Sequence, residues 1–280
     1  MKAMAASSIG QYEQAVRALG DYDDTVKLGL AVCFRGTASA AWMTGETRPA
    51  EAGTIGAVVF GSDQGLVGQF NDVVAEEAIQ TLKTLSAQAE VWAVGERVHA
   101  RLADEGLPLL GLFPVPNSVQ AVTPLVGQIL VQTEARRSQG HVSELHLFYN
   151  RPMSAAVYAP VHQRLLPLDE RWRLELEERP WPSKNLPEVL SGGAATLRAL
   201  VREYLFVSIY RACANSLASE NAARLVTMQA AERNIEEHLE ELQSTGEHHL
   251  GGDDSHQGHL LDDPRRHDAG GIVEEEKDGH

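Results

Sequence analysis

A glycine-rich turn is the feature of this chain that comes nearest to a phosphate-binding motif. It reads Gly61-Ser-Asp-Gln-Gly-Leu-Val-Gly-Gln-Phe-Asn71 and follows a short apolar run. Its glycines do not have the GxGxxG spacing, no GKS or GKT is present, and no Lys or Arg lies within it to meet a phosphate. We interpret it as a tight strand-to-helix turn whose glycines allow close packing, with nucleotide binding as the alternative.

No other group of residues has the spacing of a catalytic or metal site. There is no GxSxG nucleophile motif, and no pair of carboxylates stands out as an acid/base couple. The histidines before the last segment lack partner spacing, and we interpret each as a surface or satisfied histidine: His99, His141, His146, His162 and His238. We therefore expect no catalytic residue, no cofactor and no resident metal.

Composition limits the possible functions. The 280 residues suffice for one or two domains, and a formal net charge of −15 argues against nucleic-acid binding, which needs a basic face. The two cysteines, Cys33 and Cys213, indicate buried thiols in a reducing compartment, with a disulfide between two helices as the alternative. No signal peptide and no run of about 18 apolar residues is present, so we expect no membrane span.

The middle of the chain alternates short apolar runs with amphipathic stretches, which predicts a small α/β layer of Rossmann-like topology. The last two runs are adjacent and predict an antiparallel edge hairpin. The expected strands cover residues 54–61, 91–94, 109–115, 142–149 and 155–161. The expected helices cover residues 70–85, 96–105 and 119–137.

Two long helices are expected at the ends of the chain. Residues 211–243 contain no Gly or Pro, and residues recur every three or four positions as in a coiled-coil seam: Leu217, Asn221, Leu225, Met228, Ala231, Ile235, Leu239 and Leu242. Residues 1–34 carry a matching seam that Asp23 interrupts. We therefore expect an antiparallel coiled coil of the two terminal helices; the alternative is that both helices pack only on the central domain.

Changes of composition set the expected boundaries. They predict an N-terminal coiled-coil helix at 1–48, a central domain at 54–162, an extended Pro-rich return segment at 163–192 and a C-terminal coiled-coil helix at 193–243. Residues 244–280 hold six histidines among Gly and Asp, and we expect them to be disordered. Weak binding of Zn or Ni is the alternative role for this segment.

Three stretches resemble the gamma subunit of rotary F-type ATP synthases. The stretch Ser216-Leu-Ala-Ser-Glu-Asn-Ala-Ala-Arg-Leu-Val-Thr-Met-Gln-Ala-Ala-Glu-Arg-Asn234 resembles the family's carboxy-terminal signature. Residues 61–71 resemble its central-domain turn, and residues 1–13 its amino-terminal helix. Within the last stretch, Ser8-Ile-Gly-Gln-Tyr-Glu13 is closer to the alternate gamma subunit of the N-ATPase branch, whose members are often assigned Na⁺ transport. The resemblance covers about residues 1–243.

The resemblance implies a non-catalytic rotor subunit. Its coiled coil would turn inside the catalytic ring of alpha and beta subunits, so that nucleotide affinity at each site depends on the rotation angle. Its α/β foot would contact the epsilon subunit and the membrane c-ring, at the cytoplasmic face of the inner (plasma) membrane. Whether H⁺ or Na⁺ is coupled depends on the membrane ring. The alternatives are a soluble α/β nucleotide-binding protein and a truncated gamma remnant that does not assemble.

The resemblance also implies partner contacts on the shaft surface. The matching residues are Lys2, Met4 and Ser7 in the first helix, and Glu220, Asn221, Arg224, Met228 and Gln229 in the last. Arg224 is expected to make a charge-assisted hydrogen bond to a catalytic-subunit loop. For Met4 and Met228 the alternative is a coiled-coil core position, and for Asn221 a polar core residue that sets the register.

Two departures from the family pattern fall at the upper end of the shaft. Family members start earlier than this chain, and they end in an arginine-rich helix where this chain has residues 244–280. Because torque is transmitted at that end, the resemblance implies incomplete coupling for a chain of this sequence.

Overall fold

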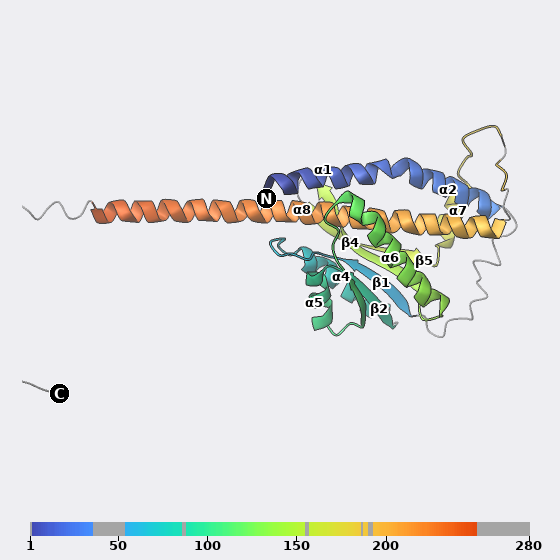
Figure 1. The fold of residues 1–280 in the computed structure, drawn as a ribbon, viewed down its shortest axis with the longest axis horizontal. Helices are drawn as coiled ribbons and strands as arrows, with labels where there is room; N and C mark the ends of the chain where they lie inside the picture. Colours follow the sequence, from blue (N-terminus) through green and yellow to red (C-terminus); the bar gives the residue numbers. More distant parts are fainter. Residues whose placement is uncertain are drawn as a thin grey trace, which may run out of the picture. The chain divides into compact units, whose positions relative to one another are not determined.

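The middle of the chain forms a five-stranded sheet that lies beside the terminal helices, as the computed structural model shows (Figure 1). The structure describes residues 2–35, 54–85, 88–154, 157–185, 187–189 and 193–250. The strand order is β3-β2-β1-β4-β5, with β1 to β4 parallel and β5 antiparallel to β4, so the predicted parallel layer with one antiparallel edge hairpin is confirmed. The strands are β1 (Ile55–Phe60), β2 (Ala89–Val94), β3 (Leu109–Phe113), β4 (Glu144–Ser154) and β5 (Val157–Leu166).

Helices cover both faces of this sheet. The helices α4 (Phe70–Thr84) and α5 (Glu96–Asp104) enclose one apolar cluster against one face. The helix α6 (Val119–Ser138) and the long terminal helices enclose a larger cluster against the other. All six residues of β1 are buried for this reason, since the central strand of a parallel sheet has apolar neighbours on both sides.

The terminal helices run antiparallel. The first consists of α1 (Lys2–Ala18) and α2 (Gly20–Arg35), with one turn residue between them, and the last is α8 (Gly193–Leu250). Pairs of neighbours show the direction: a Cβ on Gly29 would meet Leu200 at 3.0 Å, whereas Asp23 pairs with Arg211 further along α8. The helices share one hydrophobic core with the sheet, so the predicted helical pair and α/β domain are confirmed.

Asp23, which interrupts the apolar seam of the first helix, is the polar link between the two helices. Its side chain is 7% exposed, and its Oδ2 accepts hydrogen bonds from Lys27 Nζ at 2.7 Å and Arg211 Nη2 at 2.9 Å. Burial raises the pKa of this carboxyl, but the hydrogen bonds from the two cations outweigh burial and hold the pKa below its ordinary value. The carboxylate is therefore ionised and paired in the core.

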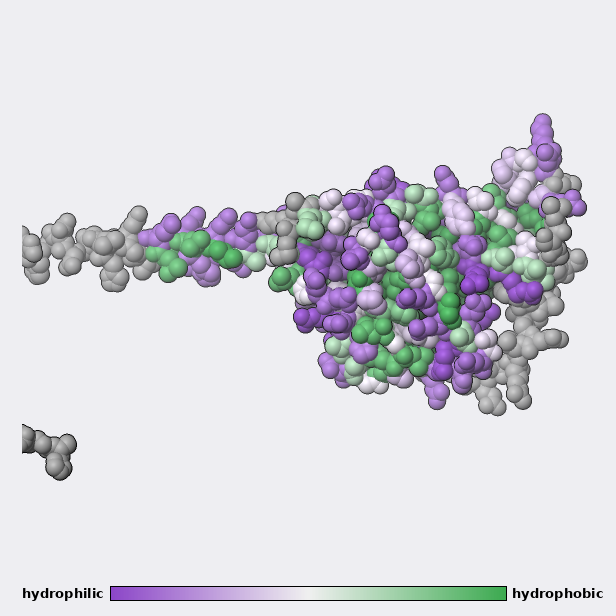
Figure 2. Space-filling model, in the orientation of Figure 1, coloured by the Kyte–Doolittle hydropathy of each residue, from purple (hydrophilic) through white to green (hydrophobic). Residues whose placement is uncertain are grey.

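The predicted seam of α8 is buried only in its first part. Leu217 is buried, as expected. Ile235, Leu239 and Leu242 are 60%, 52% and 70% exposed, and apolar side chains lie among hydrophilic ones along this part of α8 (Figure 2). An apolar stripe is buried only against a partner surface, and no described residue covers these three side chains.

Two predicted boundaries were wrong. The predicted return segment contains the end of β5 and a helix, α7 (Glu170–Glu177). The helix can form because residues 168–179 contain no proline. Asp169 caps it, since Asp169 Oδ1 accepts a hydrogen bond from Arg171 N at 2.8 Å. The helix α8 continues to Leu250, although residues 244–250 were expected to be disordered. A single glycine at 246 costs a helix only about 1 kcal/mol relative to Ala. Residues 36–48 of the predicted first helix, and 251–280, lie outside the described residues.

Both cysteines are free and buried, and the alternative of a disulfide between them was wrong. Burial raises the pKa of the Tyr12 hydroxyl, and the neighbouring Cys213 thiol adds to the rise. Tyr12 lies 21 residues before Cys33 on the first helix. At about 1.5 Å per residue, this places the two thiols roughly 30 Å apart along the helical pair. No helix among the described residues combines the length and apolar character needed to cross a bilayer.

We predict that Asp23→Asn lowers the free energy of unfolding by about 1–3 kcal/mol, because the half-buried Lys27 and Arg211 lose their anion. A carboxylate whose pKa is depressed on folding stabilises the fold above its unfolded pKa of about 3.9 and loses that contribution as pH falls through the folded pKa. Below about pH 4, the free energy of unfolding measured in urea should therefore fall more steeply for the wild type than for the variant. Asp24→Asn, which alters an exposed pair with Arg179, is the matched control. Equal losses in the two variants would contradict the assignment.

Candidate functional site

The glycine-rich turn begins at the carboxyl end of β1, where close packing leaves no room for a side chain. A Cβ on Gly61 would lie 2.4 Å from Val98 Cβ and 2.7 Å from Asn71 Oδ1. A Cβ on Gly95, whose φ is +113°, would lie 2.8 Å from the backbone of Ser62. Glycine is therefore required at both positions for β1 and β2 to turn beside α5.

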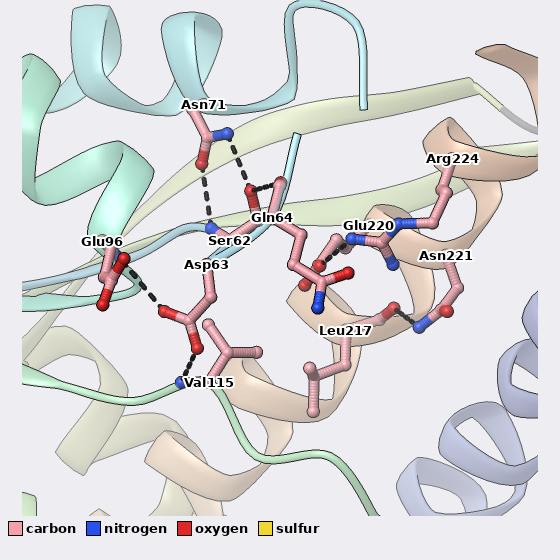
Figure 3. Close-up of polar contacts among 10 residues, drawn as sticks. All are labelled: Ser62, Asp63, Gln64, Asn71, Glu96, Val115, Leu217, Glu220, Asn221 and Arg224. Carbon is pink, nitrogen blue, oxygen red and sulfur yellow. Dashed lines mark hydrogen bonds and ion pairs between the residues drawn. The ribbon is translucent and has the colours of Figure 1, made fainter. Parts of the chain in front are cut away.

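The polar side chains of the turn are used within the protein. Ser62 N donates to Asn71 Oδ1 at 2.9 Å, Asn71 Nδ2 donates to Ser62 Oγ at 2.8 Å, and Ser62 Oγ donates to Gln64 O at 2.9 Å (Figure 3). The Ser62 side chain is buried completely. This closed set of bonds fixes the turn against the start of α4.

Asp63 connects the turn to two neighbouring segments. Its Oδ1 accepts from Glu96 N at 3.0 Å, at the first residue of α5, and its Oδ2 accepts from Val115 N at 2.9 Å, just after β3 (Figure 3). A carboxylate at a helix N-terminus satisfies a free N–H and interacts favourably with the helix dipole. The aspartate that could have approached a ligand is thus committed to structure.

The turn then packs against α8. Val67, Phe70 and Ala223 form a small buried cluster, and Tyr158 of β5 meets the Phe70 ring edge to face, with centroids 5.5 Å apart. Gly68, with φ +57°, faces Thr227. The two segments that the sequence singles out, residues 61–71 and 216–234, therefore meet, and we call this contact the turn–helix junction.

Asn150 and Ser219 complete the turn–helix junction from the side of the sheet. Asn150, on β4, donates from Nδ2 to Phe70 O at 2.8 Å and accepts at its backbone oxygen from Ser219 Oγ at 3.3 Å. Both residues are 0% exposed. Neither residue was among the predicted site residues, although an asparagine directly after the apolar run at 142–149 was the available signal, since a buried amide needs partners.

On α8 itself, Glu220 and Arg224 form an ion pair one turn apart. Arg224 Nη2 lies 2.5 Å from Glu220 Oε1, and the side chains are 16% and 6% exposed respectively. Burial raises the pKa of Glu220 and the charge of Asp63 adds to the rise, while Arg224 opposes it. Glu220 Oε2 has no hydrogen-bond partner among the described residues.

The structure describes the side chains of seven of the eight predicted contact residues, and they differ in exposure and in partners. Glu220 is buried, Arg224 is largely buried, and the two side chains bind each other. Asn221 donates a hydrogen bond to Leu217 O of its own helix at 2.8 Å. A register-setting role would require a bond across the seam instead. Met4, Ser7 and Gln229 are exposed, and Met228 is half-buried. Met4, at 74% exposed, does not occupy a core position. The side chain of Lys2 lies outside those described.

Two histidines that appear unrelated in the sequence are in contact. His146 and His162 face each other on β4 and β5, with Nδ1 and Nε2 2.8 Å apart, and His146 Nε2 lies 2.9 Å from Glu144 Oε2. Burial lowers the pKa of both rings. His146 is thus a satisfied histidine, as interpreted from the sequence, but its spacing gave no sign of the contact with His162, because strand pairing brings together residues 16 apart. No group of described residues has the arrangement of a metal site.

These features define the class of protein: a helical shaft of two antiparallel helices, with a Rossmann-like layer joined to it at the turn–helix junction. The fold is similar to a chain from the central stalk and c-ring of the mitochondrial ATP synthase of Tetrahymena thermophila, with a TM-score of 0.56. The two share 22% identity, and the match covers 83% of this chain and 97% of that one.

Sequence comparison identifies the family. A family model described as ATP synthase matches residues 1–247. Relatives include the ATP synthase gamma chain of Glaesserella parasuis serovar 5 (strain SH0165), 28% identical over 249 residues, which cover 87% of this chain and 83% of the relative. The gamma chain of Paraburkholderia xenovorans (strain LB400) is 28% identical over 255 residues, covering 87% and 84%. The chain belongs to the ATP synthase gamma-chain family. Its closeness to the N-ATPase branch stays a prediction.

We predict that Gly61→Ala lowers the free energy of unfolding by about 1–3 kcal/mol, because the added methyl group overlaps Val98 and displaces Asn71 from Ser62. Gly127→Ala is the control, since a Cβ there meets nothing within 4 Å and Gly127 lies in α6. This second variant should be more stable by roughly 0.5–1 kcal/mol. Urea unfolding followed by circular dichroism measures both, and the same sign for the two changes would be evidence against the packing account.

Proposed function

We propose that this chain is the central-stalk rotor subunit of an F-type ATP synthase, coupling rotation of a membrane ring to ATP synthesis or hydrolysis in the catalytic ring. The observation that carries the proposal is the gamma-family match over residues 1–247, on a fold whose main element is an antiparallel helical pair. A rotor has to transmit torque between two ends, and a long helix supported along its side is suited to that task.

The turn–helix junction supports this role mechanically. The turn is fixed to α4 by Asn71, to α5 by Asp63, and to α8 by the Val67–Phe70–Ala223 cluster. Because Asn150 and Ser219 link the same helix to β4, a sideways or twisting load on α8 is carried by the sheet as well as by the first helix. In this proposal, the Rossmann-like layer is the foot, and its contacts with α8 make the foot and α8 turn together.

The subunit acts without a catalytic group of its own in this proposal. The turn that resembles a nucleotide loop has its serine and aspartate engaged within the fold, which argues against the alternative of a soluble nucleotide-binding protein. The proposed partners are the alpha and beta subunits around the shaft, and the epsilon subunit and membrane c-ring at the foot. The proposed location is peripheral, on the cytoplasmic face of the inner membrane, with H⁺ or Na⁺ as the coupled ion.

The exposed members of the predicted contact set are the better candidates for contacts with the catalytic ring. Met4, Ser7 and Gln229 present accessible side chains. Arg224 already donates a hydrogen bond to Glu220. Its guanidinium has five N–H donors in total, so the proposed bond to a catalytic-subunit loop would use another of them. In this arrangement, Glu220 positions Arg224 for a partner.

The direct test is to co-express the chain with the alpha and beta subunits of its source and to measure ATP hydrolysis in the purified complex. Incorporation with a large increase in hydrolysis relative to the complex without the chain is the expected result. If the chain fails to enter the complex, and a version with a longer gamma-like end enters normally, the remnant alternative holds. Saturable ATP binding to the chain alone would favour the nucleotide-binding alternative.

A second prediction concerns the proposed contact surface. Met4→Glu should lower ATP hydrolysis by the complex by about five- to thirtyfold, because a charge placed in a contact with the ring costs roughly 1–2 kcal/mol of interaction. Met153→Glu is the matched control, since Met153 is also exposed (60%) but lies on β4 in the sheet. Both variants should incorporate to the same extent. Equal activities would remove Met4 from the proposed contact set.

A further inference from the structure

A cleft between α6 and α8 has the composition of a small ligand site. Its volume is about 130 Å³, and its floor consists of buried apolar side chains. An apolar cavity of about 150 Å³ can hold benzene, so the cleft has room for one aromatic ring or a short alkyl group. The floor is formed by Leu130, Leu145, Leu166, Val201 and Leu205.

The rim of this cleft is positively charged in a chain whose formal net charge is −15. Arg137, Arg198 and Arg202 line it together with one acid, Glu134. Glu134 lies 3.9 Å from Arg202, but both side chains are about three-fifths exposed, and such surface pairs contribute little. No described carboxylate pairs with Arg137 or Arg198. Within the part of the chain that the structure describes, two positive charges at the rim are therefore left without an ion pair.

Helix stability explains the position of Arg137 but not those of the two arginines on α8. Arg137 lies in the last turn of α6, where the helix dipole favours a cation. Arg198 and Arg202 lie four residues apart near the start of α8, where like charges repel and the positive end of the dipole gives a cation no benefit. A bound anion would offset that repulsion.

A larger cavity, of about 400 Å³ between α2, α7 and α8, has no cation without an ion pair among its lining residues. Its cations are matched by acids of the chain itself: Lys27 and Arg211 by Asp23, Arg164 by Asp169, and Arg171 by Glu175. Each cation that lines this cavity therefore has an ion-pair partner in the chain, whereas Arg137 and Arg198 at the α6–α8 cleft have none among the described residues.

We propose that the α6–α8 cleft binds a small organic anion, with a ring or short alkyl group on the apolar floor and a carboxylate or phosphate against the arginines. Arg198 and Arg202 hold the charged group from α8, and Arg137 holds it from α6. The occupant contacts both helices, so it ties α6 to the shaft. The small volume favours a soluble acid over the long acyl chain of a lipid.

The test is isothermal titration calorimetry on the full chain with four probes. Phenyl phosphate and benzoate carry both features, inorganic phosphate lacks the ring, and benzyl alcohol lacks the charge. Phenyl phosphate should bind saturably and at least about tenfold more tightly than inorganic phosphate or benzyl alcohol, since each lacks one of the two interactions. Its affinity should fall as ionic strength rises.

Variants locate the binding. Arg198→Gln and Arg202→Gln should each weaken phenyl phosphate binding by about tenfold, the loss expected for one charge-assisted contact. Arg17→Gln, which removes a guanidinium exposed on α1, should leave it unchanged. Circular dichroism verifies that each variant is folded.

Three results would overturn the proposal. The first is equal affinity for phenyl phosphate and inorganic phosphate, which would indicate only a cationic surface. The second is unchanged affinity in both α8 variants. The third is binding to phosphatidylglycerol vesicles that the variants lose, without measurable binding of phenyl phosphate, which would assign the arginines to a membrane headgroup.

Discussion

The burial of one stretch of α8, residues 207–220, on all its sides is the constraint on which the rest of the structure depends. Between residues 207 and 220, every residue except Arg211 and Asn215 is buried. A helix covered all round needs apolar surfaces on each side. Here the sheet with α6 supplies one, and α1 with α2 supplies another. The small residues of this stretch, among them Ala212, Ala214 and Ser216, let those surfaces approach closely. The two helices and the α/β layer therefore share one core.

Polar groups inside this core decide how the parts fit together. Asp23 places Arg211 of α8 against α2, and Asn150 places the turn before α4 against Ser219. Buried polar groups of this kind cost free energy unless each finds its partner. If α8 slid by one helical turn, these polar pairs would separate, whereas its apolar side chains would find other apolar neighbours. The polar pairs therefore favour a single register for α8.

The price of this arrangement is visible in three atoms. Asn150 Oδ1, Ser216 Oγ and Glu220 Oε2 are buried without a hydrogen-bond partner among the described residues. Asn150 lies on β4 and the other two on α8, where the helix meets the sheet and the turn. Unsatisfied buried atoms cost free energy, so the apolar packing around the junction has to offset them in addition to its hydrogen bonds. That agrees with a shaft that is supported along its side.

The sequence by itself determined the periodic elements and the family. Apolar runs, helical seams and the long signature of residues 216–234 are local patterns, and local patterns predict strands, helices and relatives well. Only the tertiary structure decided which of the predicted contact residues and histidines are buried. Glu220 and Arg224 are packed against the fold while Met4 and Gln229 are exposed, and His146 meets His162 across a hairpin. Such contacts join residues far apart in the chain, so their distances depend on how the elements pack, which no spacing along the sequence records.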